Sequence, residues 1–200
     1  MRVLIACEFS GIVREAFVRL GHDAWSCDLL ETELPGNHLQ CDVITVLEDG
    51  WDIMIAHPPC TYLANSGVCH LYDHVVSRTG KRAAVSGEAR WAEMRKSAWF
   101  FRQLLNANIP KIAIENPIPH RYAVAEIGRK YDQIIQPWQF GHGETKATCL
   151  WLKNLPLLEP TNIVTERKPR AHYEPPSADR WKNRSRTYRG IADAMAAQWG

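Results

Sequence analysis

The stretch Trp51-Asp-Ile-Met-Ile-Ala-His-Pro-Pro-Cys60-Thr-Tyr62 decides how this chain folds. Its apolar run, Ile53 to Ala56, is short and has no helical period, which indicates a buried β-strand. The two prolines that follow stop the strand and stiffen the next backbone. Cys60 is therefore presented at the carboxyl end of a strand, where open α/β sheets bind their ligands. A thiol there is a candidate nucleophile; a buried, inert cysteine is the alternative.

The sequence before this stretch predicts a strand, a helix and a second strand. Arg2 to Cys7 is apolar, Ile12 to Leu20 has apolar residues at helical spacing, and Asp23 to Cys27 is again strand-like and ends at Asp28. The small-residue turn Glu8-Phe9-Ser10-Gly11 would let a cofactor approach the backbone. The acid at the end of the second strand could accept hydrogen bonds from a ribose. A packing turn and a surface aspartate are the alternative.

Two further acids are expected at strand ends. His38 to Asp42 resembles a short third strand that ends in an acid, which suits the base of the same cofactor. After an amphipathic helix over Arg90 to Asn106, the buried strand that starts at Lys111 ends at Glu115. We expect Glu115 at the same sheet edge as Cys60, where its carboxyl group could hydrogen-bond a ring nitrogen. A capping acid is the alternative.

The remaining elements complete an alternating pattern. A short helix is expected around Val124 to Ile127, strands at Gln133 to Gln136 and Thr148 to Leu152, and a closing amphipathic helix from Tyr188 to Trp199. Strands that alternate with helices predict an α/β fold with a mostly parallel sheet and helices on both faces.

The composition limits the protein class. A chain of 200 residues that is 46% hydrophobic can close one core, so we expect one main domain. Six scattered cysteines indicate a reduced, cytoplasmic protein rather than a disulfide framework. We see neither a signal peptide nor an apolar run that could span a membrane, and we expect a soluble protein. A net charge of +2 permits a nucleic-acid partner without requiring one.

Two segments depart from the alternating pattern. Residues 64–90 are irregular and basic, so we expect a mobile loop that contacts phosphate and stacks on bases, or one that is merely solvated. Its Cys69-His70 and His74 lack a second ligand pair, so we expect no metal site. Residues 161–187 are rich in Pro, Arg and Lys, and this extended basic arm suggests a polyanionic partner. A solvated tail is the alternative.

In this order, the motifs resemble those of the cytosine-5 DNA methyltransferases, in particular the small methyltransferase-like proteins of bacteriophages and prophages. The most specific likeness is Pro59-Cys60, similar to the family's Pro-Cys nucleophile, with Glu115-Asn116, similar to its Glu-Asn pair. Glu144-Thr-Lys146 lies where the family has alternating arginines, and the last helix resembles its C-terminal helix. The resemblance implies a Rossmann-like fold with a seven-stranded-type sheet. It also implies a covalent Cys60 adduct, assisted by Glu115 and Lys146.

The resemblance further implies a cofactor and a division of the chain. S-adenosyl-L-methionine is the implied cofactor, and its implied binding residues are Phe9, Ser10, Gly11, Asp28, Asp42 and Pro58. Residues 1–160 would be the catalytic domain, 161–187 the arm, and 188–200 a helix that packs back on that domain. Residues 64–90 would be the closing catalytic loop.

The chain also differs from the family. Val13 and Arg14 replace glycines, and Thr61 replaces a glutamine. The basic arm stands where the family has a large target recognition domain. The resemblance implies cytosine in DNA as the substrate, whereas the missing recognition domain suggests the alternative of a free pyrimidine nucleotide or single-stranded nucleic acid. An amino-nitrogen methyltransferase, suggested by Pro58-Pro59, and a nucleic-acid-binding module without turnover are the remaining alternatives.

Overall fold

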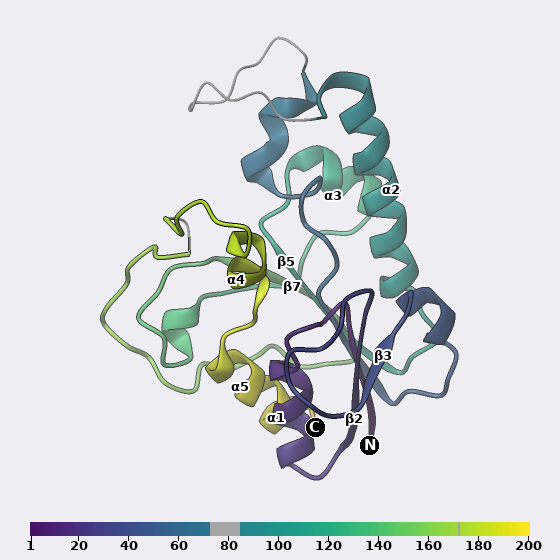
Figure 1. Cartoon of the computed structure of the whole chain (residues 1–200), viewed down its shortest axis with the longest axis vertical. Helices are drawn as coiled ribbons and strands as arrows, with labels where there is room; N and C mark the ends of the chain where they lie inside the picture. Colours follow the sequence, from purple (N-terminus) through teal and green to yellow (C-terminus); the bar gives the residue numbers. More distant parts are fainter. Residues whose placement is uncertain (73–84, 172) are drawn as a thin grey trace.

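The computed structural model describes residues 1–72, 85–171 and 173–200. Within them, a seven-stranded sheet has the order β3-β2-β1-β4-β5-β7-β6 (Figure 1). The strands are β1 (Arg2–Ala6), β2 (Asp23–Asp28), β3 (His38–Gln40), β4 (Ile53–Ala56), β5 (Lys111–Pro117), β6 (Gln133–Ile135) and β7 (Thr148–Lys153). All neighbouring pairs from β3 to β5 are parallel, and β7 runs antiparallel to both β5 and β6. The predicted α/β fold with a mostly parallel sheet is confirmed.

Helices cover both faces of this sheet. The α-helices are α1 (Ile12–Arg19), α2 (Gly87–Leu105), α3 (Arg121–Ile127), α4 (Arg180–Ser185) and α5 (Arg189–Trp199), and the 3-10 helices are η1 (Val43–Val46), η2 (Asn65–Leu71) and η3 (Pro137–Gln139). Across the described ranges, every helix is too short or too polar to cross a bilayer.

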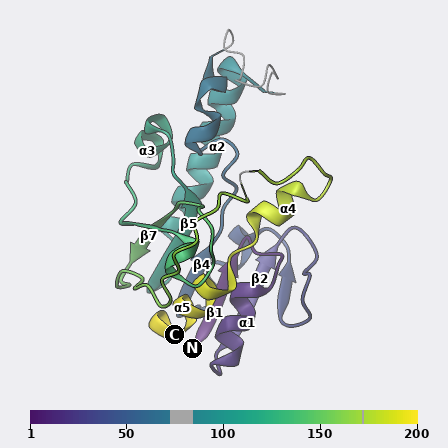
Figure 2. The same ribbon diagram turned by 90° about the vertical axis from the view of Figure 1, so that its left-hand side faces the viewer.

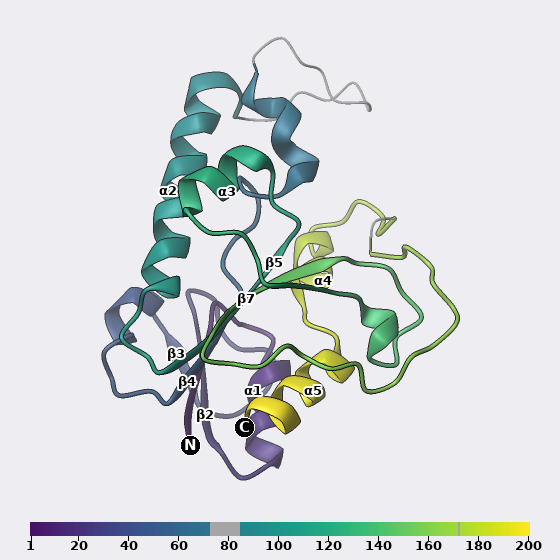
Figure 3. The same cartoon turned by 180° about the vertical axis from the view of Figure 1, so that it is seen from behind.

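The period of two in the central strands explains the two layers. Leu4 and Met54 belong to a core cluster with the apolar side of α2, whereas Ile5 and Ile55 belong to a second cluster with α1 and α5. Figure 2 shows α1 and α5 side by side, away from α2. Seen from behind in Figure 3, α3 lies against α2.

The structure differs from the sequence prediction at several boundaries. The segment expected to be irregular from residue 64 contains η2, and α2 already begins at Gly87; residues 73–84, including His74, lie outside the described residues. Strand β3 ends at Gln40, so Asp42 is not a strand end: its side chain accepts a hydrogen bond from Ile44 N and caps η1. Strand β5 continues past Glu115 because β7 pairs with it up to Pro117.

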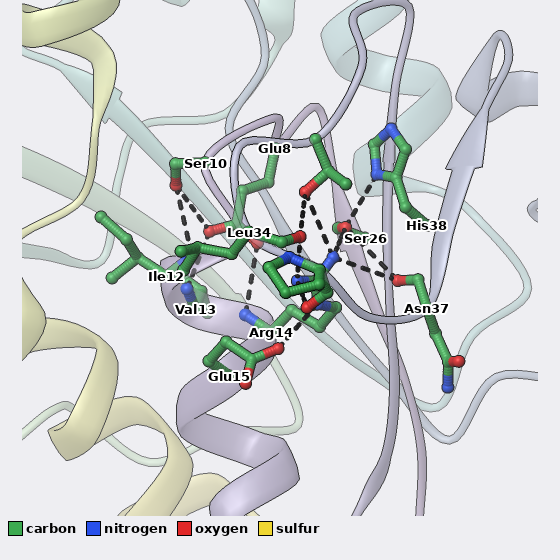
Figure 4. Close-up of polar contacts among 12 residues, drawn as sticks. Glu8, Ser10, Ile12, Val13, Arg14, Glu15, Ser26, Leu34, Asn37 and His38 are labelled. Carbon is green, nitrogen blue, oxygen red and sulfur yellow. Dashed lines mark hydrogen bonds and ion pairs between the residues drawn. The ribbon is translucent and has the colours of Figure 1, made fainter.

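Arg14 is buried where a glycine was expected from the family resemblance. Its guanidinium donates to Ser26 Oγ at 2.9 Å and to the carbonyl oxygens of Leu34 and Pro35 at 2.8 and 2.9 Å (Figure 4). Its side chain is fully buried. Arg14 is thus turned toward β2 and residues 34–37, and its guanidinium ties the carbonyl oxygens of this partly exposed loop to α1.

We predict that Arg14→Met destabilises the protein by about 3 kcal/mol, because the variant removes the hydrogen bonds by which a fully buried side chain ties Ser26, Leu34 and Pro35 to α1. Urea unfolding measures this change. The matched control is Arg19→Met on the same helix, whose exposed ion pair with Asp193 should contribute at most about 1 kcal/mol. Equal losses in the two variants would contradict a structural role specific to Arg14.

Candidate active site

Strand register brings two ionisable side chains together at the sheet edge. The last paired residues of β1, β4 and β5 in register are Ala6, Ala56 and Ile114. The next position on β4 is His57 and the next on β5 is Glu115. Because alternate residues share a face, both side chains lie on the face of Ile55 and Ala113, which α1 and α5 cover.

His57 Nδ1 and Glu115 Oε2 are 2.8 Å apart, and only 12% and 15% of the two side chains are exposed. Burial alone would lower the pKa of His57, but the hydrogen bond to Glu115 and its charge outweigh burial and raise that pKa. Burial alone would raise the pKa of Glu115, but the bond to His57 and its charge lower it. The shared proton therefore resides on His57, which differs from the protonated Glu115 that the sequence analysis would need for bonding a ring nitrogen.

Hydrogen bonds from β5 and from the residues after the turn fix the turn that follows β4. Asn116 Nδ2 donates to the carbonyl oxygen of Pro58 at 2.8 Å, and the carbonyl oxygen of Cys60 accepts from Leu63 N and Ala64 N. Among the described residues, Asn116 Oδ1 and His57 Nε2 are buried without a partner. The Pro-Pro-Cys turn is thus fixed by β5, as the stiffness of two prolines also favours.

Cys60 lies in a cavity of about 350 Å³ at the carboxyl ends of β4 and β5. Residues that line it include Phe9, Pro58, Glu115, Lys146, Trp181 and Arg184. Burial raises the pKa of the Cys60 thiol, and the positive charges of Lys146 and Arg184 offset part of this effect. The thiol is therefore protonated at neutral pH, in a site where nearby cations favour its ionisation.

A second cavity of about 350 Å³ lies beside the first and shares Cys7, Asp28 and Pro59 with it. Its walls are mostly apolar, formed by side chains such as Val43 and Phe100, and Asp42 adds a second carboxylate. Asp28 is oriented by Leu30 N, which donates to its Oδ1 at 2.9 Å. Apolar walls with two carboxylates suit a flat, amino-bearing ring attached to a hydroxyl-bearing sugar.

Glu8 occupies the amino end of α1. Its carboxylate accepts from Val13 N at 2.7 Å, from Arg14 N at 3.2 Å and from Ser10 Oγ at 3.0 Å, and Glu8 is only 5% exposed. In dinucleotide-binding folds the amides at this helix end bind a pyrophosphate. Because the buried Glu8 carboxylate already accepts these amide hydrogen bonds, the amino end of α1 favours a ligand that has no phosphate there.

The arm forms one wall of the Cys60 cavity. The rings of Trp181 and Phe9 are 5.9 Å apart, and Lys146 Nζ donates to the carbonyl oxygen of Arg184 at 2.7 Å. Arg186 forms two hydrogen bonds with the Glu33 carboxylate, at 2.6 and 2.7 Å. In contrast to the prediction from the sequence, the arm is thus not extended throughout, because Arg180–Ser185 form α4 (Figures 1 and 2). The arm also contacts residues on both sides of the cavity.

The structure brings most of the predicted site residues together. The residues around one cavity are Phe9, Asp28, Pro58, Cys60, Glu115 and Lys146. Asp42 lines the adjoining cavity and Ser10 a small recess beside His57. Gly11 caps α1 with a φ of 72°, a left-handed conformation that glycine adopts readily.

Sequence reasoning missed His57, Glu8, Trp181 and Arg184 as residues of the site. His57 could have been found from its position directly after β4, since the parallel register places it beside Glu115 of the neighbouring strand β5. Glu8 could have been found as an acid just ahead of a helix start. Nothing in the local sequence indicated that α4 would reach the cavity.

No protein-family model and no curated protein sequence matches this chain. Among solved structures, the chain is similar to a protein described as a prophage-encoded DNA modification methyltransferase of E. coli. That match has 15% identity, covers 88% of this chain and 56% of the other, and has a TM-score of 0.49. It is also similar to the Entamoeba histolytica methyltransferase EhMeth, at 14% identity, 89% and 61% coverage, and a TM-score of 0.45. The chain thus spans less than two thirds of each of these structures.

We predict that Glu115→Gln destabilises the protein most between pH 4.5 and 6.5, the ordinary pKa values of the two groups. The raised pKa of His57 adds stability that is lost as the pH rises through it, and the lowered pKa of Glu115 adds stability that is lost as the pH falls through it. We expect a loss of about 1–3 kcal/mol in that window.

Urea unfolding at about pH 5.5 and about pH 9 measures this dependence. The control is Glu126→Gln, because Glu126 forms a more exposed ion pair with Arg95. If the loss in Glu115→Gln were the same at both pH values, the ionic pair would not be the cause.

Proposed function

We propose that this protein is an S-adenosyl-L-methionine-dependent methyltransferase that acts at C5 of cytosine in DNA through a covalent Cys60 adduct. The observation that supports this most is one cavity that holds the Cys60 thiol, the His57–Glu115 pair and the Lys146 ammonium group. An adjoining cavity with Asp28 and Asp42 provides space for a cofactor.

Each side chain has a role in this proposal. Cys60 Sγ bonds to C6 of the pyrimidine and loses its proton, and Lys146 and Arg184 favour the thiolate that does so. The His57–Glu115 pair donates its proton toward N3 and so neutralises the charge that develops on the ring. C5 would then be nucleophilic and could accept the methyl group that the cofactor supplies. A water molecule takes up the C5 proton, the electrons of the Sγ–C6 bond return to Cys60 Sγ, and the N3 proton returns to the His57–Glu115 pair, which restores the aromatic ring.

The side chains of the adjoining cavity suit the chemical groups of S-adenosyl-L-methionine. Asp28 and Asp42 would accept hydrogen bonds from the ribose hydroxyls and from the adenine amino group, and the apolar walls near Phe100 would cover the ring. Glu8 disfavours a dinucleotide at the amino end of α1. When bound, S-adenosyl-L-methionine would supply an electrophilic methyl group on its sulfonium.

A second candidate substrate has support from one observation. Trp181 and Arg184 of α4 line the cavity that holds Cys60, so part of its entrance is already covered by the chain itself. A base from duplex DNA must be flipped out to reach such a site, at a cost of a few kcal/mol. A free pyrimidine nucleotide or a single strand avoids this cost.

We predict label transfer from tritiated S-adenosyl-L-methionine to at least one of three substrates: duplex DNA, single-stranded DNA and dCMP. Cys60→Ser should reduce transfer by at least about 1,000-fold because the covalent route is lost. Glu115→Gln should reduce it by about 100-fold. The matched control is Cys69→Ser, since Cys69 is also partly buried but lies on η2 in a different pocket.

The two outcomes separate the alternatives. Transfer that survives in Cys60→Ser would contradict the covalent mechanism and would favour methylation of an amino nitrogen. Binding of the cofactor by calorimetry without transfer to any of the three substrates would instead favour a nucleic-acid-binding protein without turnover.

A further inference from the structure

A second opening beside Cys60 has the chemistry of an anion site. It is a cavity of about 580 Å³ between the Pro-Pro-Cys turn, the segment before β7 and the arm. Its cations are Lys146, Arg180 and Arg184, and its hydroxyl groups are those of Thr61, Ser66, Thr145, Ser177 and Ser185. Among the described residues that line it, none is acidic. Three cations and several hydroxyl donors around one cavity match the oxygens of a phosphate.

Three other cations of the arm have acidic partners. Glu166 pairs with Lys168 and Arg170, and Glu33 pairs with Arg186. These contacts offset part of the positive charge of the outer arm, whereas Arg180 and Arg184 line the cavity together with Lys146. Three cations around one cavity are what a defined site for one phosphate requires.

Two of the three cations are also held in place by hydrogen bonds. Lys146 Nζ donates to the carbonyl oxygen of Arg184, and Arg180 Nε donates to the carbonyl oxygen of Glu174 at 2.7 Å. An ammonium group has three donors and a guanidinium five, so each cation keeps further N–H groups for a ligand. Lys146 and Arg184 line both of the cavities that Cys60 lines, so their charges lie close to its thiol.

We propose that this cavity binds the phosphate of the nucleotide whose pyrimidine ring lies over Cys60. The inference rests on the proposed function for the identity of the base, but not for the anion. Arg184 would bind the phosphate oxygens in a bidentate manner, and Lys146 would contribute a point charge between phosphate and base. The shared wall of Cys60, Thr61 and Lys146 joins the anion cavity to the base cavity, as a nucleotide requires.

Binding of dCMP and of deoxycytidine to the cofactor-free protein, measured by isothermal titration calorimetry, tests this proposal. We expect dCMP to bind at least about tenfold more tightly than deoxycytidine, and Arg184→Gln to remove most of that preference. The matched control is Lys182→Gln, which removes a positive charge from the same helix but from a residue that does not line the cavity. It should leave the preference for dCMP unchanged.

A third ligand distinguishes the two sources of the phosphate. If the single-stranded pentanucleotide d(TTCTT) binds more tightly than dCMP, the site takes the phosphodiester of a chain; the opposite order assigns it to a terminal phosphate. Both results support a phosphate site.

Equal binding of dCMP and deoxycytidine, equal losses in Arg184→Gln and Lys182→Gln, or no detectable binding of dCMP, the pentanucleotide and inorganic phosphate would each overturn the proposal. These readouts need no methyl transfer. A phosphate preference without transfer would therefore contradict the proposed function alone, whereas transfer without a phosphate preference would contradict only this inference.

Discussion

The parallel pairing of β1, β4 and β5 is the constraint on which the rest of the site depends. Parallel strands end at one edge, so the residues that follow them meet there regardless of their distance in the sequence. The register of β4 against β5 sets His57 beside Glu115, although 58 positions separate them. A shift of one residue would turn one of these side chains to the opposite face and leave the other buried without a partner. Fold and candidate chemistry therefore rest on the same backbone hydrogen bonds.

The buried ionisable side chains near this edge of the sheet all have hydrogen-bond partners, because burial makes an unpaired charge costly. Glu8, Arg14, His57 and Glu115 are all wholly or largely removed from water, and a buried charge without a partner is costly. Their charges have different partners: the amides of α1 for Glu8, carbonyl oxygens for Arg14, and each other for His57 and Glu115. These contacts preserve an ionised pair beside the thiol, and they keep the amino end of α1 closed to phosphate.

The arm gives the cleft a wall that the sheet alone lacks. Its Trp181 packs near Phe9 of the first strand-to-helix turn, and its Arg186 is tied to Glu33 in the loop after β2. Parts of the chain that are more than 150 positions apart are thus joined across the cavity. The sequence of residues 161–187 shows only that the arm is basic and rich in proline. It does not predict the contacts of the arm with the cavity, because the segment lacks the periodic apolar residues that mark a buried element.

Sequence by itself determined the elements with strong periodicity. The apolar runs of β1, β4 and β5, the helical spacing of α1 and α5, and the breaks at Pro58 and Pro59 are local signals, and they were sufficient for the α/β class and for Cys60 and Glu115 at one edge. Only the tertiary structure decided where protons and charges lie. The ionisation of Glu115 depends on a histidine from another strand, and the approach of Arg184 to Cys60 depends on the path of the arm. Such contacts join residues distant in the sequence, so no local pattern encodes them: their energies depend on burial and distance, which exist only once the chain has folded.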